Sequence, residues 1–148
     1  MSNRIILNSL FLILSSFTIL FAGCASTHHT SANIHPNALQ NTYWILSEIN
    51  NDHVQSQPSN LPNIQFSEMN VMGLNGCNRY VGSYEIKGDR IDLYKMATTA
   101  RDCSNEDPTH LKFKNALAKV KYFSISNENL SFFDAHKNQI LKFSSSTK

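Results

Sequence analysis

The stretch Gly73–Tyr94, GLNGCNRYVGSYEIKGDRIDLY, places a cysteine between two glycine-bearing turns and immediately ahead of a hairpin pattern. Tyr80–Ile86 and Arg90–Tyr94 are predicted to be strands, and they flank Lys87-Gly88-Asp89. Between these segments, Gly88 supplies the positive φ that a tight hairpin turn requires. The stretch predicts an antiparallel pair of strands. It leaves open whether Cys77 is a nucleophile, a metal ligand, half of a disulfide or a packing residue.

The sequence on both sides of this hairpin is also mostly strand-like, because short runs of aromatic and β-branched residues alternate with polar turns. Further strands are expected at Thr42–Ile49, Asn63–Ser67, around Val71 and Leu74, and at Lys121–Ile125, Leu130–Phe133 and Gln139–Phe143. A polar loop is expected over residues 50–63, and Ser144–Lys148 is expected to be a short disordered tail.

One amphipathic helix is expected after Pro108. Asp107 is placed to cap it, and the proline suits its first turn. Apolar side chains recur at helical spacing, which predicts a stripe that packs on the sheet. The stripe consists of Phe113, Ala116, Leu117 and Val120. These elements together predict an α+β fold: a single compact domain, mostly antiparallel β-sheet, curved and barrel-like, with one helix packed on it.

The first residues have the layout of a secretory signal, with the basic Arg4 followed by an uncharged apolar stretch over Ile5–Ala22. The ending Phe21-Ala22-Gly23-Cys24 resembles the lipobox of bacterial lipoproteins, with Phe21 where leucine is usual. This resemblance implies that residues 1–23 are a signal peptide and that Cys24 carries the lipid. An uncleaved anchor and an ordinary secreted protein are the alternatives.

Ala25 follows the lipid-attachment cysteine, where aspartate would imply retention in the inner membrane. The resemblance therefore implies a lipid anchor in the outer membrane with the domain in the periplasm. Residues 24–40 are expected to be a lipidated flexible tether, because they are rich in Ser, Thr and Asn. His28, His29 and His35 make only a weak metal-binding pattern, since nothing fixes their geometry.

The charge balance argues against nucleic acid as a partner. The whole chain has 13 basic and 11 acidic residues, a formal charge of +2. Removal of residues 1–23 takes away Arg4 alone and leaves +1, with 12 basic and 11 acidic residues. A nearly neutral chain without runs of Lys or Arg does not attract polyanions strongly.

The order of motifs in residues 41–148 resembles the META domain of HslJ-type heat-shock lipoproteins. The resemblance is carried by Tyr43–Leu46, Gly76–Tyr84, Thr98–Cys103, Leu130–Asp134 and Ile140–Phe143. Its most specific part is GCNRYVGSY, which contains Gly76, Asn78, Arg79 and Gly82. In the last turn, Lys137 or Asn138 stands where the family often has glycine. The resemblance implies a β-rich fold with one helix, found in envelope lipoproteins linked to stress tolerance, and it extends to some pilotins.

Export decides what the cysteines are expected to do. With Cys24 occupied by lipid, Cys77 and Cys103 remain as an even pair in an oxidising compartment, where such pairs usually form a disulfide. The bond requires Cα atoms within about 7 Å of each other. In the chain-entropy picture it would stabilise the domain by about 3–4 kcal/mol.

Reactive alternatives are weaker. A nucleophilic Cys103 with His110 as its base is disfavoured, because Asp102 would raise the thiol pKa and an oxidising compartment would cap the sulfur. A zinc site from Cys77, Cys103 and His110 lacks the paired spacing of structural zinc sites. Acidic residues that could pair as in glycosidases are Glu85, Asp89 and Asp92, which are more simply turn and surface charges. The three glycines at 73, 76 and 82 lack the Lys-Ser/Thr of a phosphate loop.

No catalytic residue, metal or cofactor is therefore expected. The sequence favours a non-enzymatic outer-membrane lipoprotein that contacts another envelope protein or a hydrophobic segment. Asn78 and Arg79 are expected to brace the turn after Cys77, with recognition as the alternative. A pilotin-like protein would instead hold a partner's helix in an apolar groove between helix and sheet. A carrier of small apolar ligands would need an apolar cavity.

Overall fold

The computed structural model describes residues 39–55, 60–104 and 107–146. The expected signal peptide, Cys24, the three tether histidines and the last two residues lie outside these described residues. Everything described belongs to one compact unit within residues 32–148.

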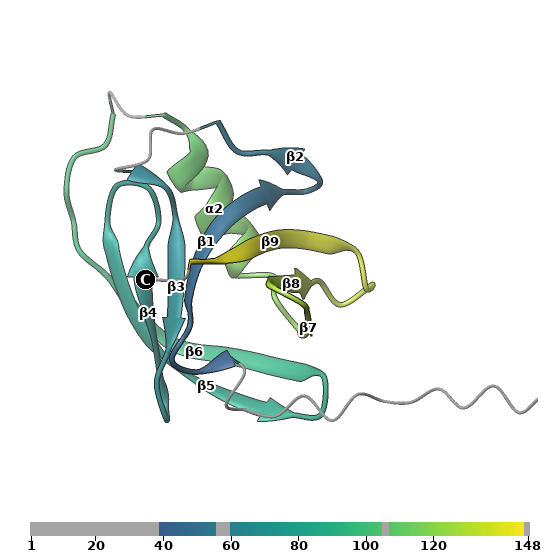
Figure 1. Cartoon of the computed structure of the whole chain (residues 1–148). Coiled ribbons are helices and arrows are strands. Elements are labelled where there is room, and N and C mark those ends of the chain that lie inside the picture. Colours follow the sequence, from purple (N-terminus) through teal and green to yellow (C-terminus); the bar gives the residue numbers. More distant parts are fainter. Residues whose placement is uncertain (1–38, 56–59, 105–106, 147–148) are drawn as a thin grey trace, which may run out of the picture. The chain divides into compact units, whose positions relative to one another are not determined.

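Nine strands and one helix make up the described part of the chain, in an antiparallel sheet with the helix beside it (Figure 1). They are β1 Tyr43–Ile49, β2 Asp52–His53, β3 Asn63–Phe66, β4 Asn70–Leu74, β5 Arg79–Lys87, β6 Arg90–Thr98, α2 Thr109–Leu117, β7 Tyr122–Ser126, β8 Asn129–Phe133 and β9 Gln139–Ser146. The α+β fold with a curved sheet and one packed helix is confirmed.

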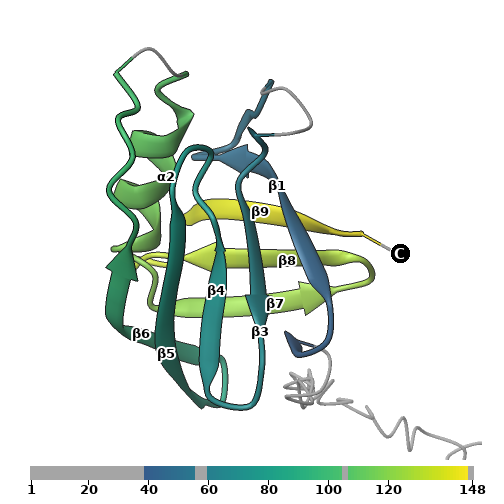
Figure 2. The same cartoon turned by 90° about the vertical axis from the view of Figure 1, so that its left-hand side faces the viewer.

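The sheet closes on itself. Its order is β2-β1-β3-β4-β5-β6-β7-β8-β9, and β9 also pairs with β1. Figure 2 shows the consequence: β3 to β6 run along one side of the ring, and β7 to β9 cross behind them at a steep angle. Pairing is weakest between β6 and β7, which share the single register pair Arg90↔Tyr122.

The ring encloses an aromatic core that joins the helix to both sides of the sheet. Phe113 of α2 meets Phe143 edge to face at 6.3 Å between ring centroids, Phe143 meets Phe132 at 5.5 Å, and Phe132 meets Phe66 at 6.4 Å. Such edge-to-face pairs add to the stabilisation that burial itself supplies. The predicted stripe is buried in this core, although α2 ends at Leu117 and its last member lies beyond the helix; its members are Phe113, Ala116, Leu117 and Val120.

The helix begins at Thr109 with Pro108 at its N-cap and without a side-chain cap, so the expected capping role of Asp107 is wrong: Asp107 lies one residue earlier. Asp107 accepts a hydrogen bond from the backbone N–H of Thr109 at 2.7 Å and another from the Thr109 hydroxyl. These bonds satisfy a free donor of the first turn. They also lower the pKa of Asp107, and the Thr109 side chain is the largest cause.

The folded unit starts earlier than the expected boundary at residue 41. Leu39 is fully buried, and its carbonyl accepts a hydrogen bond from Trp44 Nε1 at 3.2 Å. Gln40 forms a bridge with Phe66 and donates to the Tyr84 hydroxyl at 3.0 Å. A single leucine in a polar stretch gives no hydrophobic periodicity, so the sequence predicts that Leu39 and Gln40 belong to the tether.

The prediction of a disordered tail is wrong for Ser144–Ser146. These serines extend β9 and pair with β1, from Ser144↔Ile45 to Ser146↔Tyr43. The expected polar loop after β1 also contains more structure than predicted. Asn50 and Asn51 have φ values of 52° and 68°, the paired positive values of a type I′ turn, and they join β1 to the short β2.

Candidate functional site

The GCNRY motif forms a tight turn between β4 and β5. The Asn75 side chain is buried, and its Oδ1 accepts backbone hydrogen bonds from Cys77 at 2.9 Å and from Asn78 at 2.7 Å. Gly76 has φ +106°, a conformation that side-chain-bearing residues rarely adopt. The turn therefore requires glycine at 76 and presents Cys77 inward.

Cys77 and Cys103 form a disulfide, with their Cα atoms 6.2 Å apart and a sequence separation of 26. The bond ties the β4–β5 turn to the loop between β6 and α2. While both sulfurs are in this bond, neither is the free thiolate that a cysteine nucleophile or a zinc ligand must be.

Asn78 connects the same two loops by hydrogen bonds. Its Oδ1 accepts from the Thr99 hydroxyl at 2.9 Å and from the Arg101 backbone N–H at 2.8 Å. Its Nδ2 lies 3.1 Å from the Cys103 sulfur and 3.5 Å from the Arg101 carbonyl. The side chain thus braces the loop beside the disulfide. The adjacent Arg79 contributes its backbone to this arrangement, and its side chain is exposed.

Two other glycines allow close approach of neighbouring atoms. A Cβ on Gly73 would lie 2.0 Å from the Asn63 carbonyl oxygen, and one on Gly82 would lie 2.2 Å from the Met96 sulfur. Opposite Gly82, strand β6 bulges at Lys95, which has a φ of 52°. Gly82 therefore lets Met96 reach across the face of β5.

The outer surface of β3 to β6 carries a hollow of about 650 Å³, which we call the outer-face hollow. Met72 and Val81 line it with exposed fractions of 41% and 49%, and they alternate with the buried Val71 and Tyr80. The hollow therefore lies on the face turned away from the core. Arg79 is the one charged residue in its lining. Exposed apolar patches of this kind often mark protein contacts.

A second space lies between α2 and β6, and we call it the helix–sheet pocket. Its volume is about 330 Å³. Apolar side chains from both elements line it, with two lysines, one asparagine, one threonine and one tyrosine among them. Of the residues singled out in the sequence, Phe113, Leu117 and Val120 reach this pocket.

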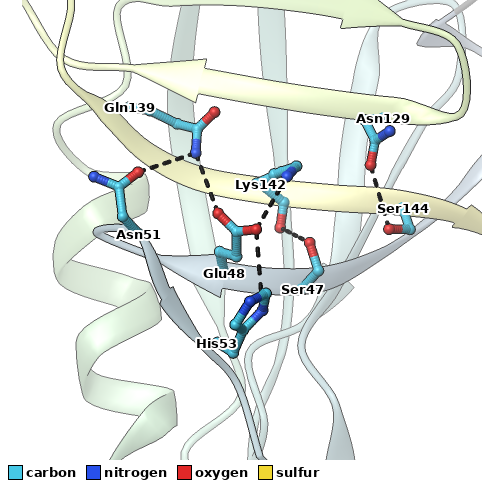
Figure 3. Close-up of polar contacts among 8 residues, drawn as sticks. All are labelled: Ser47, Glu48, Asn51, His53, Asn129, Gln139, Lys142 and Ser144. Atoms are coloured by element: carbon cyan, nitrogen blue, oxygen red, sulfur yellow. Dashed lines mark hydrogen bonds and ion pairs between the residues drawn. The ribbon is translucent and has the colours of Figure 1, made fainter.

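The ring is sealed between β1 and β9 by a polar cluster that the sequence did not reveal (Figure 3). Glu48 accepts hydrogen bonds from Lys142 at 3.0 Å and from Gln139 at 3.4 Å, and His53 lies 4.0 Å away. Ser47 is the extra residue of a β-bulge and donates to the Lys142 carbonyl at 3.0 Å. Glu48 is separated from Gln139 and Lys142 by more than 90 positions in the chain, so no local sequence pattern indicates the cluster.

The hairpin carboxylates are each paired with a cation. Glu85 lies 3.0 Å from Lys87, and Asp89 lies 2.7 Å from Lys137. The hydrogen bond from Arg90 lowers the pKa of Asp92. A general acid of the glycosidase kind needs a raised pKa, so Asp92 has the opposite property. Among the described residues, no group of three His, Cys, Asp or Glu side chains is arranged to hold a metal ion.

The described part of the chain is therefore a small α+β domain. It is defined by a closed antiparallel sheet, one packed helix and a disulfide that holds the GCNRY turn. The META domain family model matches residues 37–147, and the chain belongs to this family. It is also similar to heat shock protein HslJ of Escherichia coli K12, with 28% identity over 90 residues, 61% of this chain. The match spans 62% of the length of HslJ.

Solved structures support the fold. One protein determined by NMR has a TM-score of 0.62 at 22% identity, covering 75% of this chain and 94% of that one. A protein from Burkholderia xenovorans, also determined by NMR, has a TM-score of 0.59 at 21% identity, with 76% and 86% covered. A DUF4847 family protein from Bacteroides vulgatus has a TM-score of 0.56 at 12% identity, with 76% and 97% covered.

Within the described part of the chain, no helix has the length and hydropathy needed to span a bilayer.

Proposed function

We propose that this protein is a non-enzymatic lipoprotein of the outer membrane, anchored through Cys24, whose META domain contacts another envelope protein from the periplasm. The outer-face hollow is the observation that carries the proposal. It combines a volume of about 650 Å³ with exposed apolar side chains, which suits an apolar segment of a partner. The similarity to a protein named for heat shock supports a role in stress tolerance.

Two features support a binding role over catalysis. The cysteines that could act as nucleophiles are joined in a disulfide, which instead stabilises the fold. Hydrogen bonds from Lys137 and Arg90 lower the pKa values of Asp89 and Asp92 at the β5–β6 hairpin, which favours the ionised form of these two carboxylates and not proton donation.

Site-specific photocrosslinking tests the contact. A photoreactive phenylalanine analogue would replace Val81 in the hollow, and in a matched variant it would replace Met69, which is 71% exposed and does not line the hollow. In living cells, the full chain should give a discrete adduct with one envelope protein from position 81 and none from position 69. No adduct at position 81, or the same adducts at both positions, would contradict the proposal.

Mass analysis of the protein taken from membranes tests the anchor separately. The expected mature chain starts at Cys24 and carries acyl groups, and Cys24→Ala should abolish both the cleavage and the acylation. A chain that still carries residues 1–23 in the unmodified protein would contradict the lipoprotein assignment.

A pilotin-like role is the alternative, and the helix–sheet pocket occupies the place that it requires. One turn of a helix, about 5.4 Å long and about 10 Å wide, occupies on the order of 400 Å³. The pocket would therefore admit side chains of a partner helix and not a whole turn. Deletion of the gene would leave a secretin in the inner membrane if this alternative held.

A further inference from the structure

The helix–sheet pocket exists because the ring is weakest where β6 meets β7. After the single pair Arg90↔Tyr122, the two strands are no longer register partners, and α2 follows β6 in the chain. The helix packs its Phe113 into the core but leaves a space of about 330 Å³ against β6. This volume is at the lower end of the range for small-molecule sites.

The walls of the pocket are apolar and adaptable. Leu93 and Met96 come from β6, and Phe113 and Leu117 come from α2. Met96 is 38% exposed and lies over Gly82, where a Cβ would be 2.2 Å from its sulfur. Methionine adapts its shape easily, so this wall can adjust to a flexible chain. The glycine of the family motif therefore helps to form the pocket.

The charge around the pocket has one sign. Lys114 and Lys121 are its charged lining residues. Lys121 lies 3.5 Å from Asp92, so part of its charge is balanced, whereas Lys114 has no ion pair within the described part of the chain. An anionic group at the pocket would therefore find an unpaired ammonium.

Two of the three neutral polar side chains of the lining, those of Tyr80 and Asn75, are already engaged within the protein. The Tyr80 hydroxyl donates to the Asn63 carbonyl at 2.7 Å, and Asn75 accepts two backbone hydrogen bonds of the β4–β5 turn. Such groups do not need a polar ligand body to complete their hydrogen bonds. A fitting ligand is consequently apolar along its length and charged at one end.

We propose that the helix–sheet pocket binds a medium-chain fatty acid, with the hydrocarbon chain between β6 and α2 and the carboxylate paired with Lys114. The pocket volume of about 330 Å³ suits the single hydrocarbon chain of a medium-chain fatty acid and not the two long chains of a phospholipid. The pocket shares Tyr80 and Thr98 with the lining of the outer-face hollow, but the proposal does not depend on the proposed envelope contact.

Methyl NMR tests this proposal on the full chain held in phospholipid nanodiscs. With ¹³C-labelled methionine methyl groups, octanoate should shift the Met96 signal in a saturable way. Met69 and Met72, which do not line the pocket, serve as internal references. Octanol, which has the same chain length without the charge, should bind about tenfold more weakly, the factor expected from loss of one ion pair.

Two variants and a matched control separate the contribution of charge from that of shape. Lys114→Glu should weaken octanoate binding at least about tenfold and leave octanol binding nearly unchanged. Lys112→Glu makes the same charge change on the same helix outside the pocket lining and should have a small effect. Ala118→Trp, which places a large side chain in the lining, should abolish binding of both ligands.

Three results would overturn the proposal. The first is the absence of a saturable Met96 shift with octanoate. The second is a larger shift at Met72, which would place the ligand at the outer-face hollow. The third is equal weakening by Lys112→Glu and Lys114→Glu, which would show only general attraction to a basic helix. An unchanged methyl spectrum of each ligand-free variant, apart from sites next to the substitution, would verify that the fold is intact.

Discussion

Among the residues of the GCNRYVGSY motif, Asn78 has the most clearly defined structural role. A single amide side chain satisfies the Thr99 hydroxyl and the Arg101 backbone N–H, and it lies against both disulfide sulfurs. The sequence predicts that Asn78 braces a turn. It does not indicate that the partner is a loop more than 20 residues away, because that pairing depends on how β5 and β6 align.

Replacement of Asn78 by alanine should therefore destabilise the domain by about 1–2 kcal/mol, since the Thr99 hydroxyl and the Arg101 N–H, both exposed, lose their hydrogen bonds to it together. Urea unfolding at pH 7 would measure this change. Asn129→Ala is the matched control: its Oδ1 accepts one long bond from Ser144 at 3.5 Å (Figure 3). The control should change stability by less than about 0.5 kcal/mol. Equal effects of the two substitutions would contradict the bracing role.

Lys137 stands in the last turn, where the family often has glycine, and it has a φ of 64°. Two contacts offset this unfavourable backbone conformation. Its ammonium lies 2.7 Å from Asp89 and 3.3 Å from the centroid of the Tyr122 ring. The hydrogen bond from Lys137 also lowers the pKa of Asp89. The departure from the family pattern is thus compensated by the side chain itself.

Two substitutions at Lys137 separate the backbone from the side chain. Lys137→Ala loses both contacts and keeps the positive φ, whereas Lys137→Gly loses the contacts and relieves the backbone. The glycine variant should be more stable than the alanine variant by about 1 kcal/mol, and it should lie close to the unmodified protein. Thermal melts of the three proteins would measure these differences. An alanine variant as stable as the glycine variant would show that the turn is not strained.

At the scale of elements, the end of β9 has the most unexpected role. Ser144, Ser145 and Ser146 pair with β1 on one side, and Ser144 pairs with Asn129 of β8 on the other. A run of serines has low β-propensity and no alternation of polar and apolar residues, so it predicts disorder. Here the backbone pairs, not the side chains, place it in the sheet.

Deletion of Ser144–Lys148 should open the seam of the ring and destabilise the domain by roughly 2–3 kcal/mol, at about 1 kcal/mol for each backbone hydrogen bond lost. Deletion of residues 147–148 alone is the control and should have little effect. Urea unfolding and hydrogen exchange at the Tyr43 and Ile45 amides would report the loss. If both truncations have the same stability, the pairing of these serines contributes nothing to the ring.

The elements that the sequence predicts well are those with a local pattern. The β5–β6 hairpin follows from two strand-like runs on either side of Gly88, whose φ is 64°, and α2 follows from its apolar stripe. A curved, barrel-like sheet is expected from the sequence, but the pair of strands that closes it could not be predicted, because β1 and β9 are about 100 residues apart. The outer-face hollow and the helix–sheet pocket depend on sheet curvature and on the bulge opposite Gly82. Neither feature has a sequence signal of its own.

At the scale of the whole molecule, acidic side chains stabilise turns and ends of elements all over the surface. Five aspartates have lowered pKa values. In four of them the main cause is a hydrogen bond from another side chain, and in the fifth it is a hydrogen bond from a backbone N–H. The lowered groups are Asp89 with Lys137, Asp92 with Arg90, Asp102 with the N–H of Ser104, Asp107 with Thr109 and Asp134 with Asn138. In acid, the folded state therefore binds fewer protons than the unfolded state.

This difference gives the pH dependence of stability a definite sign. A carboxyl whose pKa is lowered by folding contributes stability above its unfolded pKa of about 3.9, and the contribution is lost as the pH falls through the folded pKa. As far as these groups determine it, the melting temperature should be nearly constant between about pH 5 and pH 7. It should decrease as the pH is lowered below about 4.

The variant Asp134→Asn tests this origin of the pH dependence. In this variant, the hydrogen bond from the Asn138 side-chain amide to the carboxylate is lost at every pH. The melting temperature of this variant should lie below that of the unmodified protein at pH 6, and the gap should narrow as the pH falls below about 4 and Asp134 takes up a proton. A gap that stays constant across this range would show that the ionised carboxylate of Asp134 does not stabilise the fold.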